Sequence, residues 1–207
     1  MIPVTSAPVS PDLLSLASAA QDLLFREAHT AHAFTDEPVG EEAIAAVFDL
    51  IKYAPTSLNS QPLRGVLVRP GAARERLVEL MNPNNRAKTG QAPLTAILAA
   101  DLDFHETLPR LVPHLPNARD FFADPKTRHE GAVLNAALQI GYFVLGVRAA
   151  GLAAGPMSGF DAEGVAKEFF PDEPYRPLVV VNIGHPAPDA FRPRAPRLEF
   201  TEVFRTV

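Results

Sequence analysis

The sequence predicts an α+β fold with a central mixed sheet flanked by helices, organised as a single domain over residues 1–207. Segments with helical periodicity alternate with short apolar runs that suit strands. The run Leu94–Ala100 is continuously apolar, as expected of a buried central strand. The stretch Gly131–Val147 is apolar on nearly every side, which is typical of a long helix buried in a large core.

The remaining elements follow from periodicity and from the positions of glycine and proline. Helices are expected over residues 11–27, 40–53, 72–81, 83–90 and 162–170, and strands over residues 64–69, 152–157 and 178–183. The first ten residues form a short polar tail, and the proline-rich C-terminal stretch is expected to be an extended arm. Between Asp103 and Lys126 no period holds, so we expect a binding segment or lid with short helical pieces.

The apolar stretch Gly131–Val147 has 17 residues, the lower limit for a membrane span. It contains Asn135 and Gln139, one helical turn apart, and both amides would be costly in lipid. Small residues such as Gly141 would allow another helix to approach closely. We therefore favour a buried core helix, partly at a subunit interface, over a membrane helix.

Composition excludes several classes of protein. The chain has no cysteine, so it has no disulfide, thiolate metal site or cysteine nucleophile. Its net charge is −5, so no global basic field attracts nucleic acid. No leader sequence or metal-ligand motif is apparent, so we expect a cytoplasmic protein without a metal, a membrane or a nucleic-acid partner. No Gly-x-Gly-x-x-Gly follows a strand, so a nicotinamide cofactor has no dedicated nucleotide-binding domain.

The turn Ala54–Pro62 lies between a predicted helix and a predicted strand. Its two prolines restrict the backbone and make the turn stiff. Asn59 and Gln61 each offer two donors and one acceptor, enough to bind the edge of a flat heterocycle. By composition alone, a simple turn that ends a helix is the favoured interpretation of these residues.

This turn, Pro-Thr-Ser-x-Asn-Ser-Gln-Pro, resembles the flavin-contacting turn of the FMN-dependent nitroreductase family. Three later segments are similar to that family's flavin-contacting segments and come in the same order: Asn85–Lys88, Gly155–Phe160 and Arg192–Arg194. Further runs resemble the malonic semialdehyde reductase branch: Lys52–Ser57, Asp101–His105, Leu108–Pro109, Pro113–His114, Asn117–Phe122 and Gly155–Asp161. The resemblance extends from about Leu24 to Phe204.

The resemblance implies a nitroreductase-like homodimer with FMN sites at the interface and NADPH or NADH as reductant. The branch implies an oxidoreductase that reduces 3-oxopropanoate (malonic semialdehyde) to 3-hydroxypropanoate by ping-pong hydride transfer through flavin N5. A broad-specificity nitro or quinone reductase and a flavin-binding protein without turnover are the alternatives.

Residue by residue, the resemblance implies a set of cofactor-binding positions. They are His29, Thr30, His32, Pro55, Thr56, Ser57, Leu58, Asn59, Gln61, Asn85, Lys88, Pro156, Met157, Ser158, Gly159, Arg192 and Arg194. His29 stands where the branch has a phosphate-binding arginine, which leaves Arg192 and Arg194 as the expected phosphate anchors. Lys88 is expected to stabilise negative charge on the reduced flavin.

A 3-oxo acid carries one carboxylate, which a cationic side chain must hold. Arg119 lies in the expected lid, and an arginine can meet a carboxylate through two parallel hydrogen bonds. Arg119 is therefore the candidate substrate anchor. The alternative is a surface ion pair between Arg119 and Asp120 or Asp124.

Overall fold

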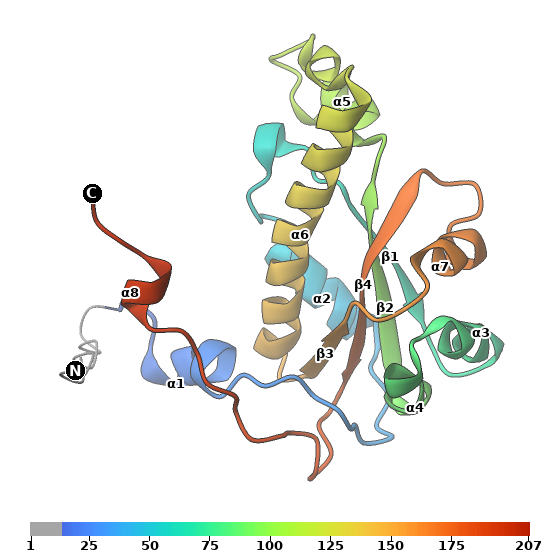
Figure 1. Ribbon diagram of the computed structural model, residues 1–207, viewed down its shortest axis with the longest axis vertical. Coiled ribbons are helices and arrows are strands. Elements are labelled where there is room, and N and C mark those ends of the chain that lie inside the picture. Colours follow the sequence, from blue (N-terminus) through green and yellow to red (C-terminus); the bar gives the residue numbers. More distant parts are fainter. Residues whose placement is uncertain (1–13) are drawn as a thin grey trace.

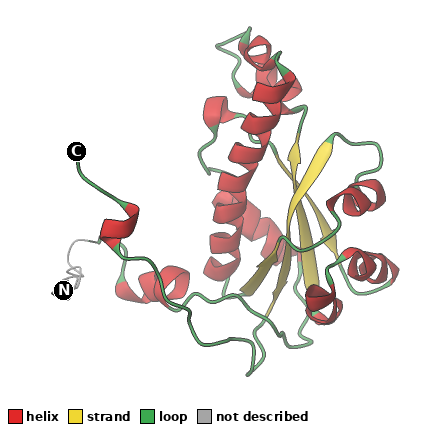
Figure 2. Ribbon diagram, in the orientation of Figure 1, coloured by secondary structure: helices red, strands yellow, loops and turns green. Residues whose placement is uncertain are grey.

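A four-stranded sheet in the order β1-β2-β4-β3 forms the centre of the structure, a computed structural model that describes residues 14–207 (Figures 1 and 2). The strands are β1 Leu63–Val68, β2 Leu94–Asp101, β3 Ala153–Met157 and β4 Tyr175–Gly184. All three neighbouring pairs are antiparallel, so the expectation of a mixed sheet was wrong. The chain leaves β1 at Val68 and enters β2 beside it, with Val68 opposite Thr95, whereas a parallel pair needs a crossover along the sheet.

Helices cover both faces of the sheet (Figure 1). Helices α2 (Glu41–Ile51) and α6 (Pro125–Ala149) pack on one face, and α3 (Ala72–Leu80) and α7 (Ala162–Phe169) on the other. Successive side chains of a strand point to opposite faces. Accordingly Leu94, Ala96 and Leu98 contact the α2–α6 layer, whereas Ile97 and Ala99 contact the α3–α7 layer. Burial on both faces explains why β2 is continuously apolar.

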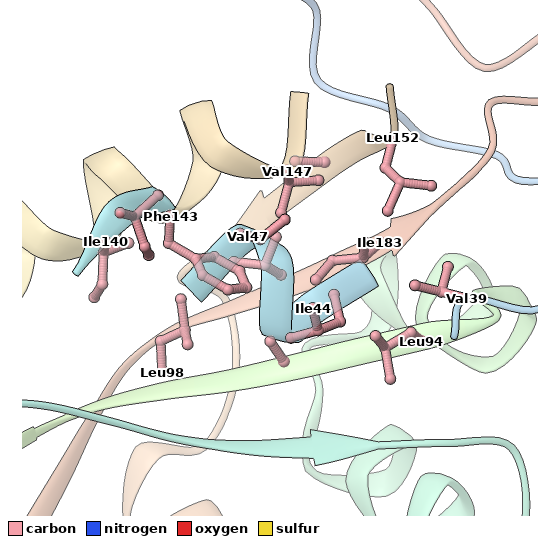
Figure 3. Close-up of a cluster of buried hydrophobic side chains, with 14 residues drawn as sticks. Val39, Ile44, Val47, Leu94, Leu98, Ile140, Phe143, Val147, Leu152 and Ile183 are labelled. Atoms are coloured by element: carbon pink, nitrogen blue, oxygen red, sulfur yellow. The ribbon is translucent and has the colours of Figure 1, made fainter. Parts of the chain in front are cut away.

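The long helix α6 begins after Asp124, whose carboxylate accepts a hydrogen bond from the Thr127 backbone N–H (2.8 Å). Its inner face packs through Ile140, Phe143 and Val147 against α2 and the sheet (Figure 3). A Cβ at Gly146 would lie 2.5 Å from Ile51 Cγ2, so this glycine allows the two helices to touch. Helix α6 is therefore central to the larger hydrophobic core.

The outer face of α6 is exposed, which departs from a helix buried on every side. Leu134 is 64% exposed, and Leu138 and Tyr142 are also exposed. Among residues 14–207, α6 is the one helix long and apolar enough to cross a membrane by those criteria. Its inner face, however, is part of the domain core, and its apolar outer face forms a continuous surface stripe.

The two ends of the described chain contain only short helical pieces. The helix expected over residues 11–27 is shorter: α1 spans Ser18–Gln21 and a π-helical segment spans Asp22–Arg26, while residues 11–13 lie outside the described residues, as does the predicted polar tail. No side-chain cap defines the start of α1. After β4 the expected extended arm is confirmed, interrupted only by α8 (Phe200–Val203), and it passes close to α1 (Figure 1).

The segment between β2 and α6 contains three short helical pieces, as expected. They are η4 Phe104–Thr107, α5 Leu108–Leu111 and η5 Ala118–Phe122. Phe104 and Leu108 are fully buried and pack against Ala132 and Ala136 of α6. Leu58 also contacts this cluster, so the segment, called the lid below, touches the Ala54–Pro62 turn. The remaining helix, α4 (Pro83–Gln91), precedes β2.

Candidate cofactor and substrate site

The Ala54–Pro62 turn has an unusual backbone. Leu58, Asn59 and Gln61 all have positive φ angles, at 51°, 50° and 44°. Residues other than glycine avoid positive φ angles, and a bulky residue such as leucine does so most strongly. Such strain persists only where surrounding contacts enforce it, and it is common at ligand sites. The turn is therefore held in shape by other parts of the chain.

Two side-chain amides on α6 hold the turn. Asn135 Oδ1 accepts a hydrogen bond from Ser57 N–H (2.7 Å), and Gln139 Oε1 accepts one from Leu63 N–H (3.0 Å). Both amides are buried, at 5% and 8% exposure. Within the turn, Thr56 Oγ1 accepts from Gln61 N–H (3.2 Å). The two polar residues that argued against a membrane helix thus fix both sides of the turn.

The turn presents its remaining polar groups to a cavity of about 530 Å³. Pro55, Thr56, Asn59 and Gln61 line this cavity, together with residues at the end of α2. The two amides also contact each other, because Gln61 Nε2 donates to Asn59 Oδ1 (2.9 Å). Asn59 Nδ2 donates to the Leu111 carbonyl of the lid (3.3 Å). The turn and the lid therefore form one connected surface.

A second cavity, of about 440 Å³, lies between the N-terminal helical segment and the C-terminal arm. Four of the expected phosphate-side residues, His29, Thr30, Arg192 and Arg194, line it, and so does His32. Arg192 and Arg194 therefore face the same cavity although two residues apart on an extended arm. Two further arginines, Arg148 and Arg197, also line it, and the described part of the chain contributes no carboxylate to this lining. We call this the cationic cavity.

The electrostatics of this region reflect the gathering of like charges. Burial lowers the pKa of His32, and the nearby cations Arg192 and Lys88 lower it further. Burial also lowers the pKa of Lys88, again with a contribution from Arg192. Lys88 of α4 does not line the cationic cavity, but the charge of Arg192 acts on both His32 and Lys88. A bound anion would relieve the repulsion among all three groups.

Asn85 and the Pro156–Gly159 segment meet at the end of β3. Asn85 Nδ2 donates to the Gly159 carbonyl (2.9 Å), and a Cβ at Gly159 would lie 2.8 Å from that nitrogen. Met157 is buried in the core, where its sulfur accepts a hydrogen bond from Thr89 Oγ1 (3.9 Å). Ser158 is exposed and Pro156 half-exposed. This segment therefore offers backbone groups and Ser158, but not the Met157 side chain, to a ligand.

Gly155 allows a close contact between β3 and the N-terminal segment. A Cβ at this position would lie 2.6 Å from the Ala31 carbonyl oxygen. The Ala31 N–H donates to the Ala154 carbonyl (3.0 Å), and the His32 N–H donates to the Ala190 carbonyl (2.8 Å). Gly155 thus allows the segment carrying His29 and His32 to lie against β3. The close approach is between two parts of the chain.

The expected cofactor residues form two groups that do not meet within one protomer. The turn is attached to α6 at Asn135, whereas His29 is attached at Arg148, whose Nη2 donates to the His29 carbonyl (3.2 Å). Asn135 and Arg148 are 13 residues apart on α6, about 20 Å along the axis. Lys88 is close enough to Arg192 of the cationic cavity for their charges to interact, and Asn85, one helical turn before Lys88, contacts Gly159. Pro55–Gln61 belong to the distant turn.

Arg119 does not lie free on the lid. Its Nη2 donates to Glu106 Oε1 (2.6 Å), and both side chains are about half exposed. Arg119 thus forms a surface ion pair, as the alternative expected, but its partner is Glu106 and neither Asp120 nor Asp124. In the described part of the chain, no group of three or more His, Asp or Glu residues is arranged to hold a metal ion.

Sequence analysis missed four residues of this region: Asn135, Gln139, Arg148 and Arg197. The first two carried a signal, because two amides one turn apart in an apolar helix need partners. Arg148 and Arg197 carried none, since each reaches the cavity from an element whose position only the fold determines.

Comparison with known proteins identifies close relatives. The family model described as Nitroreductase family matches residues 25–185. A candidate NADH dehydrogenase/NAD(P)H nitroreductase of Streptomyces griseus is 60% identical over 195 residues, covering 94% of this chain and 99% of that protein. One of the same name from Leptothrix cholodnii is 47% identical over 187 residues, covering 90% and 95%.

Solved structures share the fold at lower identity. A candidate nitroreductase from Exiguobacterium sibiricum, in complex with FMN, matches with a TM-score of 0.82 and 18% identity, covering 92% of this chain and 98% of that one. A candidate nitroreductase from Bacillus subtilis matches with a TM-score of 0.81 and 22% identity, covering 92% and 100%.

The hydrogen bond from Ser57 to Asn135 gives a prediction about stability. Asn135→Leu keeps the volume of the side chain but leaves the Ser57 N–H without its acceptor. We expect the free energy of unfolding, measured by urea titration, to fall by about 1–3 kcal/mol, the cost of an unsatisfied buried donor. Asn117→Leu, at an exposed position on the lid, is the control and should change it by less than about 0.5 kcal/mol. Equal losses in the two variants would contradict the role of Asn135.

Proposed function

The chain belongs to the nitroreductase family, and we propose from this membership that it is a cytoplasmic, homodimeric oxidoreductase that uses FMN and NAD(P)H to reduce a small carbonyl acid. The observation that carries the proposal is the pairing of a cationic cavity with a stiff, amide-bearing turn. A flavin mononucleotide has both a doubly charged phosphate and a flat ring with hydrogen-bonding edges.

The residues present fit such a cofactor. The lining of the cationic cavity contains four arginines, two histidines and the Thr30 hydroxyl, a donor set suited to a phosphate. Asn59 and Gln61 offer amide groups on a backbone that is already fixed, so little entropy is lost when they bind a ring. Gly159 allows the Asn85 side chain to lie against the backbone, which holds this amide in place.

Bound FMN would supply the redox chemistry, being reduced by NAD(P)H and reoxidised by the substrate in a ping-pong sequence. The protein's part is to bind and orient. Lys88 and Asn85 on α4 would hold one edge of the ring system, and the turn would hold the other. Reductant and substrate would use the same site in succession.

The visible spectrum of the purified protein tests this function. We expect a yellow protein whose flavin absorbance is lost on anaerobic addition of NADPH or NADH and returns when an oxidised substrate is added. A protein that binds FMN without bleaching by either nucleotide would support the flavin-binding alternative without turnover. A colourless protein that takes up no added FMN would contradict the proposal.

A dimer would bring the two groups of cofactor residues together. Within one protomer they are separated by about 20 Å along α6. The stripe of Leu134, Leu138 and Tyr142 on α6 is apolar and exposed, as expected of a surface that a partner covers. If two α6 helices pack together, the turn of one protomer reaches the cationic cavity of the other. We expect this interface to bury more than about 2,000 Å², the size at which obligate interfaces begin.

Gly141 gives a direct test of the dimer. Within the protomer, a Cβ at Gly141 has no atom within 4 Å, so a larger residue fits without strain. If a partner helix packs on this face, Gly141→Leu should separate the subunits and reduce FMN content, measured by analytical ultracentrifugation and absorbance. Glu163→Leu adds an exposed leucine to α7 and should leave a yellow dimer. A wild-type monomer at micromolar concentration that still holds FMN would refute the shared site.

We further propose 3-oxopropanoate as the substrate, as the resemblance to the malonic semialdehyde reductase branch implies. The lid that carries Arg119 contacts the turn through Leu111 and Leu58. Arg119 pairs with the Glu106 carboxylate, which the carboxylate of the acid would replace. The names of the relatives favour the alternative, a broad nitro or quinone reductase, which needs no cationic anchor.

Variants of Arg119 separate these two substrate classes. Arg119→Ala should raise KM for 3-oxopropanoate at least tenfold, about 1.4 kcal/mol, because a binding contact is lost. Reduction of a neutral quinone should change little. Glu106→Gln removes the competing carboxylate and should lower KM for the acid or leave it unchanged. If Arg119→Ala impairs both substrates alike, Arg119 is structural and the semialdehyde assignment loses its anchor.

A further inference from the structure

Arg148, near the end of α6, contacts the N-terminal segment of the chain. It is the second-last residue of α6, where a basic side chain commonly bonds the last carbonyls of its own helix. Its guanidinium instead crosses to the N-terminal segment. Nη2 donates to the His29 carbonyl (3.2 Å), and Nη1 donates to the Leu24 carbonyl at a longer 3.4 Å. These two contacts use only part of its five N–H donors.

Positive charge gathers in the cavity that Arg148 lines. Arg194 lines the same cationic cavity, and among residues 14–207 no carboxylate belongs to its lining. Burial lowers the pKa of Arg148, and the charge of Arg194 lowers it further. Glu27 shares an adjoining cavity with Arg148 and His29 but does not line the cationic cavity. The charges of Arg148 and Arg194 repel each other. A bound dianion would turn this repulsion into a favourable contribution to binding.

The residue that Arg148 contacts, His29, makes the positive charge of Arg148 important for phosphate binding. His29 stands where the related branch has an arginine, and a neutral imidazole cannot replace the permanent charge and planar fork of a guanidinium. Arg148 holds the backbone of His29 itself, so its guanidinium lies beside the position of the missing arginine. The positive charge absent from the N-terminal segment is thus present on the end of α6.

We propose that Arg148, together with Arg194, binds the FMN phosphate and takes over the part of the arginine that His29 replaces. This inference rests on the proposed function, since it assigns the phosphate to the cationic cavity. It makes Arg148 a binding residue for the cofactor, in addition to its support of the Leu24–His29 backbone.

The experiment compares FMN with riboflavin, which has the same ring but no phosphate. Dissociation constants are measured by fluorescence titration at pH 8, where an ordinary imidazole is neutral. Arg148→Gln should weaken FMN binding ten- to a hundredfold, the range for a charged hydrogen bond, and riboflavin binding less than threefold. Arg148→Lys keeps the charge and should recover most of the loss. Arg69→Gln is the matched control, because Arg69 also donates to a backbone carbonyl, that of Val39, but lies outside the cavity.

A second background tests the replacement directly. In His29→Arg the phosphate regains its arginine, so adding Arg148→Gln should cost less than about fivefold in FMN affinity. Equal loss of FMN and riboflavin affinity, or equal effects of Arg148→Lys and Arg148→Gln, would show that Arg148 only supports the backbone and would overturn the inference. Unchanged FMN affinity would also overturn it. A wild-type protein that binds neither flavin would refute the proposed function instead.

Discussion

The structure depends on the contact between two buried amides of α6 and the turn that precedes the sheet. Asn135 and Gln139 accept hydrogen bonds from Ser57 and Leu63, at the middle of the turn and at the first residue of β1. The same helix forms the core through Ile140, Phe143 and Val147. A movement of α6 therefore changes the hydrophobic core and the ligand-binding turn together. Because the turn carries three residues with positive φ, it has no stable shape of its own without this support.

Near the C-terminal end of α6, positively charged groups are concentrated. Arg148, His32 and Lys88 all have lowered pKa values, with burial as the largest cause and neighbouring cations as the next. In a chain of net charge −5, this concentration of positive groups is local. The pKa of His32 is lower in the folded state than in the unfolded state. His32 therefore does not affect the free energy of unfolding at pH values above its unfolded-state pKa, and lowers that free energy as the pH falls below it. An anion in the cavity would raise this pKa and oppose the effect.

Much of the fold could be predicted because it is encoded locally. The apolar run of β2 identified that strand to within one residue. The long apolar stretch identified α6, although the helix begins at Pro125, six residues before the apolar stretch. Strand direction could not be predicted, because side-chain alternation is the same in parallel and antiparallel sheets. The exposed outer face of α6 was also hidden, since apolar side chains on all sides suit either a core or a subunit contact. For the site, the turn was found from its own residues. Its supports lie 76 to 78 residues away, and the contact between Arg148 and His29 spans 119.

Leu58 connects the turn with the lid. Glycine would suit its positive φ far better, and a search for stabilising substitutions by backbone preference alone would choose glycine here. Yet the leucine side chain packs into the cluster formed by Phe104, Leu108 and the neighbouring lid residues. Glycine at this position would remove the side chain that packs the turn against the lid, so the strained backbone and the contact with the lid are linked through one residue.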